Sequence, residues 1–335
     1  MRPPKRLAPT FVIGALSITL TAQFALALWI FSPIAIGWPD IIAAVWPGAG
    51  EMSVSAQVIQ LVRVPRAIGG IAIGAALALC GLMMQGATRN RLASPTLLGV
   101  TSGASLGLAI VSSGVLGASG ALSSSAAAVL GGAVAWALVF LLGSAWSIDG
   151  SKGRLVLAGM TMAALCAGLT RLVVLLAEER ALGVLNWLAG SLGNIRYDDL
   201  PLMTGMMVAG LAIGFLVAPK LNLLNLGDET AETLGVRVKT VRIIVFVTGC
   251  LIVGATVAVT GPIAFIGLMA PNIARALVGS DYRLLVPTSA LAGAILLLGS
   301  DIVARGVAYP AEIAAGAVTA LIGAPFFLIL ARRIQ

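Results

Sequence analysis

The sequence predicts an all-α, polytopic membrane protein with about ten transmembrane helices. Of its 335 residues, 59% are hydrophobic and only 10% are charged, whereas soluble domains carry about 25% charged residues. Because a spanning helix needs about 20 apolar residues, this composition can supply about ten spans. The 40 glycines suit helices that pack closely in lipid. Little sequence remains for a soluble domain.

Ten apolar runs divide the chain into these spans. They lie near residues 10–31, 61–84, 95–115, 122–143, 154–177, 201–218, 241–260, 262–278, 286–304 and 314–331. An even number of spans places both termini on the same side of the membrane. We therefore expect residues 1–335 to form a single transmembrane domain.

The distribution of basic residues predicts that both termini are cytoplasmic. In that orientation, 15 of the 21 Lys and Arg residues lie on the cytoplasmic side, five lie outside and Arg171 lies within a span. Cytoplasmic loops of membrane proteins carry such an excess of Lys and Arg. The net charge of +8 therefore follows from topology and requires no nucleic-acid partner.

Two fragments suggest an internal repeat. "GAALALCG" at 74–81 and "GATVAVTG" at 254–261 share the pattern G-A-x-x-A-x-x-G and fall in the second and seventh spans. A five-span offset reverses direction across the membrane, so true copies would form an inverted repeat like those of transporters. Ordinary small-residue packing between helices explains the pattern equally well, and both interpretations stay open.

The chain carries no motif for energy conversion or covalent chemistry. A P-loop requires Gly-Lys followed by Ser or Thr, and none of the lysines follows a glycine. All 13 acidic residues fall in loops or at span ends, which argues against a proton-coupled secondary transporter. Histidine is absent, which argues against an intramembrane enzyme.

The three cysteines predict neither a disulfide framework nor a metal site. Cys80, Cys166 and Cys250 each lie inside an apolar run, where a free cysteine behaves as a small hydrophobic residue. We expect this chain to bind no metal or cofactor, and any ATP to be bound by another chain.

Arg171 is the charged residue expected inside a span. A charge at the bilayer centre costs about 2.5 to 3.5 kcal/mol, so something should compensate for it. One interpretation is that Arg171 faces a water-filled pathway and meets an anionic solute. The alternatives are snorkelling to the interface or an ion pair with Glu178, two helical turns away.

The segment "LGDETAETLGVRV" at 226–238 is polar in an otherwise apolar chain. Asp228 is a good N-cap, and Glu229 and Glu232 lie where the helix dipole favours acids. Gly235 fits the C-terminal cap position. The segment therefore predicts one short cytoplasmic helix.

A helix over 228–234 is too short to be stable alone in water and must be held by packing. Ala231 and Leu234 fall on one side, which we expect to bury, while the two glutamates share another side. The helix is then either a docking element for a partner or a capped turn that merely orders its loop.

Six stretches, spread over nearly the whole chain, resemble the FecCD family of ABC-importer permeases. This family comprises type II importers for iron-siderophore complexes, haem and vitamin B12. The stretches are "RVPR" (63–66), "MMQGATRNRLASPTLLGVTSGASLG" (83–107), "LGDETAETLGV" (226–236), "GPIAFIGLMAPNIAR" (261–275), "SDIVAR" (300–305) and "IGAPFF" (322–327).

The resemblance implies a vitamin-B12-importer-like permease fold in the bacterial cytoplasmic (inner) membrane. The implied substrate is an iron chelate, with a ferric siderophore favoured over haem or cobalamin. A stand-alone channel or secondary transporter is the more remote alternative. The implied partners are a second permease subunit, identical or paralogous, a periplasmic or surface substrate-binding protein, and two cytoplasmic ATPase subunits that bind ATP and Mg²⁺.

The resemblance also implies roles for particular residues. The cytoplasmic segment 219–240 contains the expected coupling helix that docks on the ATPase. Its candidate contact residues are Asp228, Glu229, Thr230, Glu232, Leu234 and Gly235. Outside, the candidates for docking the binding protein are Arg63, Arg66 and Arg305, although each could also be an ordinary solvated charge.

A helix-break motif completes the expected sites. It consists of Gly261, Pro262, Pro271 and Asn272, and both prolines are expected to interrupt the local helix. The freed carbonyls must find protein or water, so we expect a packed or cavity-lining turn. The family commonly has histidine where this chain has Asn272, which keeps a hydrogen-bonding role but cannot titrate.

Overall fold

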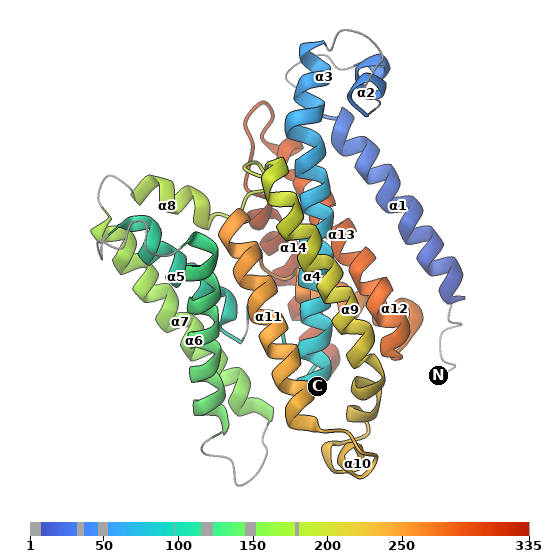
Figure 1. The fold of residues 1–335 in the computed structure, drawn as a ribbon, viewed down its shortest axis with the longest axis vertical. Coiled ribbons are helices and arrows are strands. Elements are labelled where there is room, and N and C mark those ends of the chain that lie inside the picture. Colours follow the sequence, from blue (N-terminus) through green and yellow to red (C-terminus); the bar gives the residue numbers. More distant parts are fainter. Residues whose placement is uncertain are drawn as a thin grey trace.

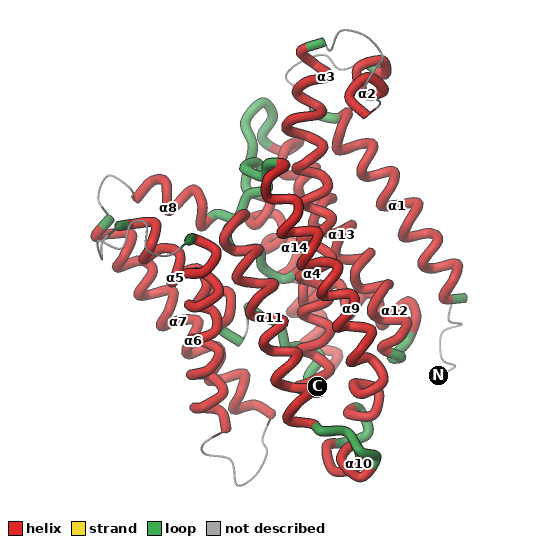
Figure 2. The backbone as a smooth tube through the Cα atoms, viewed as in Figure 1, coloured by secondary structure: helices red, strands yellow, loops and turns green. Residues whose placement is uncertain are grey.

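The computed structural model describes residues 8–31, 37–45, 53–96, 98–114, 123–144, 152–177 and 181–334, and all regular structure within these ranges is helical (Figures 1 and 2). The prediction of an all-α membrane protein is confirmed. The long and medium helices are α1 (Pro9–Trp29), α4 (Val64–Thr88), α5 (Val100–Ser113), α6 (Ser124–Ser144), α7 (Lys152–Leu176), α9 (Leu200–Leu224), α11 (Val238–Thr260), α12 (Ile266–Val278), α13 (Tyr282–Val307) and α14 (Ala315–Ile334). The short elements are α2 (Trp38–Val45), α3 (Val54–Val58), the π-helix η1 (Ile59–Arg63), α8 (Ala181–Leu188), the 3₁₀-helix η3 (Tyr197–Asp199) and α10 (Asp228–Thr233).

Each of the ten predicted apolar runs overlaps one of the long or medium helices, several of which extend beyond the run. Among the described residues, eight helices are long and apolar enough to cross a membrane. The other two, α5 and α12, have 14 and 13 residues, fewer than the roughly 20 that a full crossing requires. The runs at 95–115 and 262–278 therefore combine a short helix with irregular chain, instead of forming continuous spanning helices.

Helix α4 forms the axis of the molecule (Figure 1). In its apolar stretch 89% of the residues are buried, compared with 67% in α11 and 61% in α13. It contacts α9, α11, α12 and α13, whereas only 17 to 28% of the residues are buried in the other candidate spans. Those peripheral helices expose leucines and phenylalanines, as expected of surfaces that meet lipid or another membrane subunit.

Glycines let two helices approach the backbone of α4. A Cβ atom on Gly74 would overlap the carbonyl of Gly293 in α13, and one on Gly81 would overlap the carbonyl of Gly267 in α12. Helix association in lipid depends on such close packing because no hydrophobic driving force separates helices from lipid tails. The small residues of α4 therefore determine how closely α12 and α13 pack against it.

The chain breaks its helix between α11 and α12, as predicted at Gly261 and Pro262. Helix α11 ends at Thr260, Gly261 adopts φ 75°, and Phe265 adopts φ 66° immediately before α12 begins. A positive φ is uncommon for a bulky residue. Phe265 lies directly against Gly323 of α14, which has no side chain to prevent the approach.

The break is packed, not open to solvent, because three chain segments meet there through their backbones. The Ser191 amide donates to the Thr260 carbonyl at 2.8 Å, and the Gly316 amide donates to the Gly190 carbonyl at 2.8 Å. Backbone groups inside a membrane protein need such partners. The loop after α8, the end of α11 and the start of α14 therefore form one junction.

The prediction that Pro271 interrupts its helix is wrong. Helix α12 continues through Pro271 to Val278. Proline cannot donate to the carbonyl four residues earlier, here that of Gly267. The buried Gln85 of α4 supplies the missing donor, since its Nε2 lies 3.3 Å from the Gly267 oxygen.

The two fragments of the suggested repeat lie on α4 and α11, which run in opposite directions (Figure 1). Their glycines pack against different neighbours, Gly74 against α13 and Gly254 against Val129 of α6. Small-residue packing accounts for both fragments, and the inverted repeat stays a prediction.

Replacing Gly81 with alanine should destabilise the protein. The new methyl group would collide with backbone in α12, and overpacking of this kind costs about 1 to 3 kcal/mol. Gly205→Ala is the matched control, because a Cβ atom there has no neighbour within 4 Å. Thermal unfolding in detergent should show a lower midpoint for Gly81→Ala only, and equal midpoints for both variants would contradict the packing account.

Candidate functional site

A short helix, α10, projects from one end of the bundle between α9 and α11 (Figure 1). The backbone turns at Gly227, with φ 122°, and again at Gly235, with φ 85°. The Gly235 amide donates to the Glu232 carbonyl and the Val236 amide to the Ala231 carbonyl, both at 2.9 Å. These two bonds form a Schellman motif, so Gly235 has the predicted capping geometry.

The other end of α10 differs from the prediction. Gly227 is the N-cap residue and no side chain caps the helix there. Asp228 is instead the first helical residue, and its carboxylate is bound by two arginines. The Arg242 Nη2 lies 2.8 Å from Asp228 Oδ2, and the Arg89 Nη1 lies 3.4 Å from Asp228 Oδ1.

The exposed surface of α10 and its flanking turns carries both acidic and apolar side chains. Glu229, Thr230 and Glu232 are exposed, while Ala231 is buried. Leu234 was expected to be buried with Ala231, but it is 56% exposed because it lies past the last helical turn. Leu226, which the sequence interpretation missed, is 64% exposed at the preceding turn.

A second polar cluster lies at the same end of the bundle. Arg275 of α12 donates from Nη1 to Gln85 at 2.7 Å and from Nη2 to the Tyr282 hydroxyl at 3.3 Å. The Asn222 amide of α9 donates to Asp281 at 2.8 Å. This bond is the main cause of a pKa for Asp281 below its usual value, so the carboxylate stays ionised into more acidic solution.

The three arginines predicted for docking come together at the opposite end. Arg66 of α4 forms ion pairs with Asp301 of α13 at 2.8 Å and with Glu312, in the loop after α13, at 2.7 Å. Arg305 lies 3.3 Å from the other oxygen of Asp301. We call these residues, together with Arg63, the outer cluster.

Arg63 and Arg305 also bind the end of α1. Arg63 donates to the carbonyls of Leu28, Ile30 and Phe31 at 2.8 to 3.1 Å. Arg305 donates to the Ala27 carbonyl at 3.0 Å. The last carbonyls of a helix have no partner within the helix, so these two arginines satisfy the terminus of α1.

The alternative that these arginines are ordinary solvated charges is therefore wrong, and their docking role stays a prediction. Arg63, Arg66 and Arg305 are only 7, 6 and 5% exposed, and Asp301 is 1% exposed. Glu312, with 48% of its side chain exposed, is the accessible member. The sequence interpretation missed both acids, although the i, i+4 spacing of Asp301 and Arg305 was a usable signal.

Arg171 lies on the exposed side of α7. It lines a groove of about 260 Å³ with Thr170, Val174 and Leu185. Its suggested partner Glu178 lies outside the described residues. Arg171 lies only five residues before the end of α7 at Leu176, close enough for its long side chain to snorkel to the interface. The pathway and snorkelling interpretations therefore both stay predictions.

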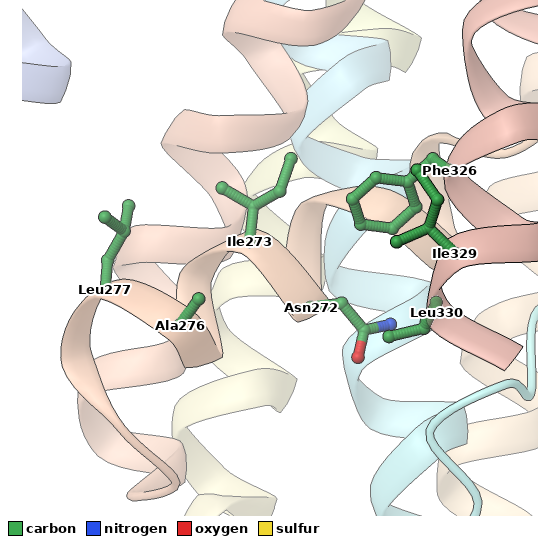
Figure 3. Close-up of a pocket in the computed structure, with 7 residues that line it drawn as sticks. All are labelled: Asn272, Ile273, Ala276, Leu277, Phe326, Ile329 and Leu330. Carbon is green, nitrogen blue, oxygen red and sulfur yellow. The ribbon is translucent and has the colours of Figure 1, made fainter. Parts of the chain in front are cut away.

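Asn272 forms the polar wall of an apolar pocket of about 230 Å³ between α12 and α14 (Figure 3). Its Nδ2 donates to the Leu268 carbonyl at 2.8 Å and to the Arg91 carbonyl at 3.1 Å. The side chain thus joins α12 to the loop after α4. In the part of the chain that the structure describes, no group of three or more Cys, Asp or Glu residues could hold a metal ion.

The model of the FecCD transport family matches residues 18–333. The chain belongs to the FecCD transport family. It is 41% identical over 325 residues to the Fe(3+) dicitrate transport system permease protein FecC of Escherichia coli (strain K12), covering 97% of this chain and 98% of the relative. It is 39% identical over 275 residues to the hemin transport system permease protein HmuU of Yersinia pestis, covering 81% and 82%.

The fold agrees with this family. A solved structure described as an inward-facing metal-chelate type ABC transporter superposes with a TM-score of 0.79 at 30% identity, covering 97% of this chain and 99% of that one. The chain is thus a multi-pass membrane protein of the type II importer fold, and its relatives are transport permeases.

Replacing Asp301 with asparagine should destabilise the protein strongly. Two nearly buried arginines would lose their shared counterion, and breaking a buried pair costs about 3 to 5 kcal/mol. Glu312→Gln is the matched control, because an exposed pair contributes about 1 kcal/mol or less. Unfolding midpoints should fall clearly for Asp301→Asn only, and equal shifts in both variants would contradict a buried role for Asp301.

Proposed function

We propose that this chain is the permease subunit of a binding-protein-dependent ABC importer and encloses the pathway of an iron chelate. A second permease subunit, identical or paralogous, would complete the pathway, and two cytoplasmic ATPase subunits would bind ATP and Mg²⁺ and drive it. The observation that carries this proposal is α10. It is a six-residue helix bounded by glycines with positive φ, and it presents exposed glutamates between two exposed leucines.

The exposed face of α10 supports a docking role over an ordered turn. Leu226 and Leu234 are largely exposed on a loop that the excess of basic residues predicts to be cytoplasmic. Apolar side chains surrounded by charges at a projecting tip are typical of a protein interface. Glu229 and Glu232 would then select a basic surface on the ATPase.

The proposed substrate is an iron chelate, and ferric citrate is the first candidate to test. The two relatives above are named for ferric dicitrate and for hemin, and their identities to this chain, 41% and 39%, are too close to separate these substrates. Arg171 would suit an anionic chelate at the pathway. Cobalamin is the alternative within the same class of importer.

For docking of the substrate-binding protein, we propose the outer cluster as a whole, not three free arginines. It holds three arginines and two acids, so its formal charge is +1, and Glu312 covers Arg66 on the exposed side. An approaching carboxylate would be attracted to this charge.

Reversing the charge of α10 should prevent coupling. We expect Glu229→Arg combined with Glu232→Arg to weaken binding of the ATPase and to abolish substrate-stimulated ATP hydrolysis, while membrane insertion stays normal. Asp198→Arg, an exposed change at the opposite end of the bundle, is the control. Unchanged stimulated hydrolysis in the double variant would contradict the docking role.

Reconstitution with the ATPase and a binding protein should yield uptake that requires ATP. We expect accumulation of ferric citrate, a ferric hydroxamate or hemin in proteoliposomes, and none without ATP. Uptake by this chain alone without ATP would contradict the importer proposal, and ATP-driven uptake of cobalamin alone would contradict the iron-chelate substrate.

Removing the exposed acid of the outer cluster should speed docking. Glu312→Gln raises the local charge by one without disturbing the buried pair, so association with an acidic face of the binding protein should be faster at low salt. Stopped-flow association at low and high ionic strength measures this. Equal or slower association at low salt would exclude the outer cluster as the docking surface.

A further inference from the structure

Asp228 differs from the other candidate coupling residues because its carboxylate is already bound. It is paired with Arg242 at 2.8 Å and with Arg89 at 3.4 Å, whereas no ion pair is found for Glu229 or Glu232 among the described contacts. A carboxylate held by two guanidinium groups is poorly available to a partner protein. We therefore look for the role of Asp228 in its contacts within the chain.

The arginines that hold Asp228 both lead to α4. Arg89 is the residue that ends α4, with φ 52°. Arg242 belongs to the first turns of α11, and its Nε donates to the Ala87 carbonyl in the last turn of α4 at 3.0 Å. One guanidinium thus binds α10 through Nη2 and α4 through Nε. Its planar fork allows both bonds in a fixed geometry.

Helix α4 is well placed to be displaced when α10 moves. It is the most buried of the candidate spans. Near its cytoplasmic end Gln85 binds both the Gly267 carbonyl and Arg275 of α12, and at its outer end Arg66 binds Asp301 of α13. A displacement of the end of α4 would therefore act on α12 and α13, which pack against it along glycine contacts.

We infer that Asp228 is a positioning residue that transmits movement of α10 to the cytoplasmic end of α4 through Arg242, with Arg89 as a second, longer contact. This rests on the proposed function of α10 as the coupling helix. Glu229, Glu232 and the exposed leucines contact the ATPase, while Asp228 and Arg242 pass the displacement on. Contact with the partner and transmission within the chain are thus carried by different side chains of the same helix.

The test separates binding of the ATPase from transmission. Asp228→Asn, Arg242→Gln and the double variant are reconstituted with the ATPase and binding protein. Asp198→Asn, an exposed change of the same kind at the opposite end of the bundle, is the matched control. The readouts are ATPase copurification and ferric citrate taken up per ATP hydrolysed. We expect copurification to stay normal and uptake per ATP to fall at least about fivefold, the lower end of typical coupling between sites. Uptake per ATP in the double variant should be no lower than in either single variant, because both single changes break the same contact between Asp228 and Arg242.

A further variant separates transmission from simple support of α10. Arg242→Lys keeps a positive charge near Asp228, but one ammonium group cannot reproduce the fork that also reaches the Ala87 carbonyl. We expect Arg242→Lys to leave the unfolding midpoint and copurification near wild type and to lower uptake per ATP as Arg242→Gln does. Wild-type uptake per ATP in Arg242→Lys would overturn the inference.

Loss of ATPase copurification in Asp228→Asn, or unchanged uptake per ATP in that variant, would also overturn it. These failures differ from failure of the proposed function. If wild-type protein neither binds the ATPase nor shows ATP-dependent uptake, the importer proposal itself falls. If wild type is active and only the predicted uncoupling is absent, the transmission role alone is excluded.

Discussion

The close backbone contacts of α4 with α12 and α13 are the constraint on which the rest of the structure depends. In lipid, apolar area does not favour one helix neighbour over another, so packing and hydrogen bonds must select the arrangement. Gly74 and Gly81 place the carbonyls of Gly293 and Gly267 against α4. A central helix held in this way transmits displacement along its length, because close-packed interiors are not readily compressed.

The two ends of α4 are held by charges, and the middle is held by small residues. At the end near the outer cluster Arg66 is paired with the buried Asp301, and at the end near α10 the chain makes contacts through Gln85, Ala87 and Arg89. Charged groups cost much more free energy at the bilayer centre than near its surfaces. The proposed ATPase surface on α10 and the proposed docking surface at the outer cluster therefore lie at opposite ends of one rigid element.

The local features of the fold could be predicted from the sequence. Apolar runs located the ten main helices, and the acids and glycine of 226–238 predicted α10 and its cap at Gly235, since these depend on neighbours in the chain. The burial of Arg63, Arg66 and Arg305 could not be predicted, because it depends on Asp301 and on α1 carbonyls that only the tertiary structure brings near. Pro271 stayed helical for the same reason, with Gln85 supplying a donor from 182 residues away along the chain.

Spin-label distances would test most directly the central claim, that α10 and the neighbouring end of α4 move together. Labels on Thr233 and Arg91 report the distance between these elements, and labels on Thr233 and Arg332 report movement of α10 relative to α14; all three residues are exposed. In the reconstituted complex, ATP should change the Thr233–Arg332 distance and leave the Thr233–Arg91 distance unchanged. An equal change in both distances would contradict the account.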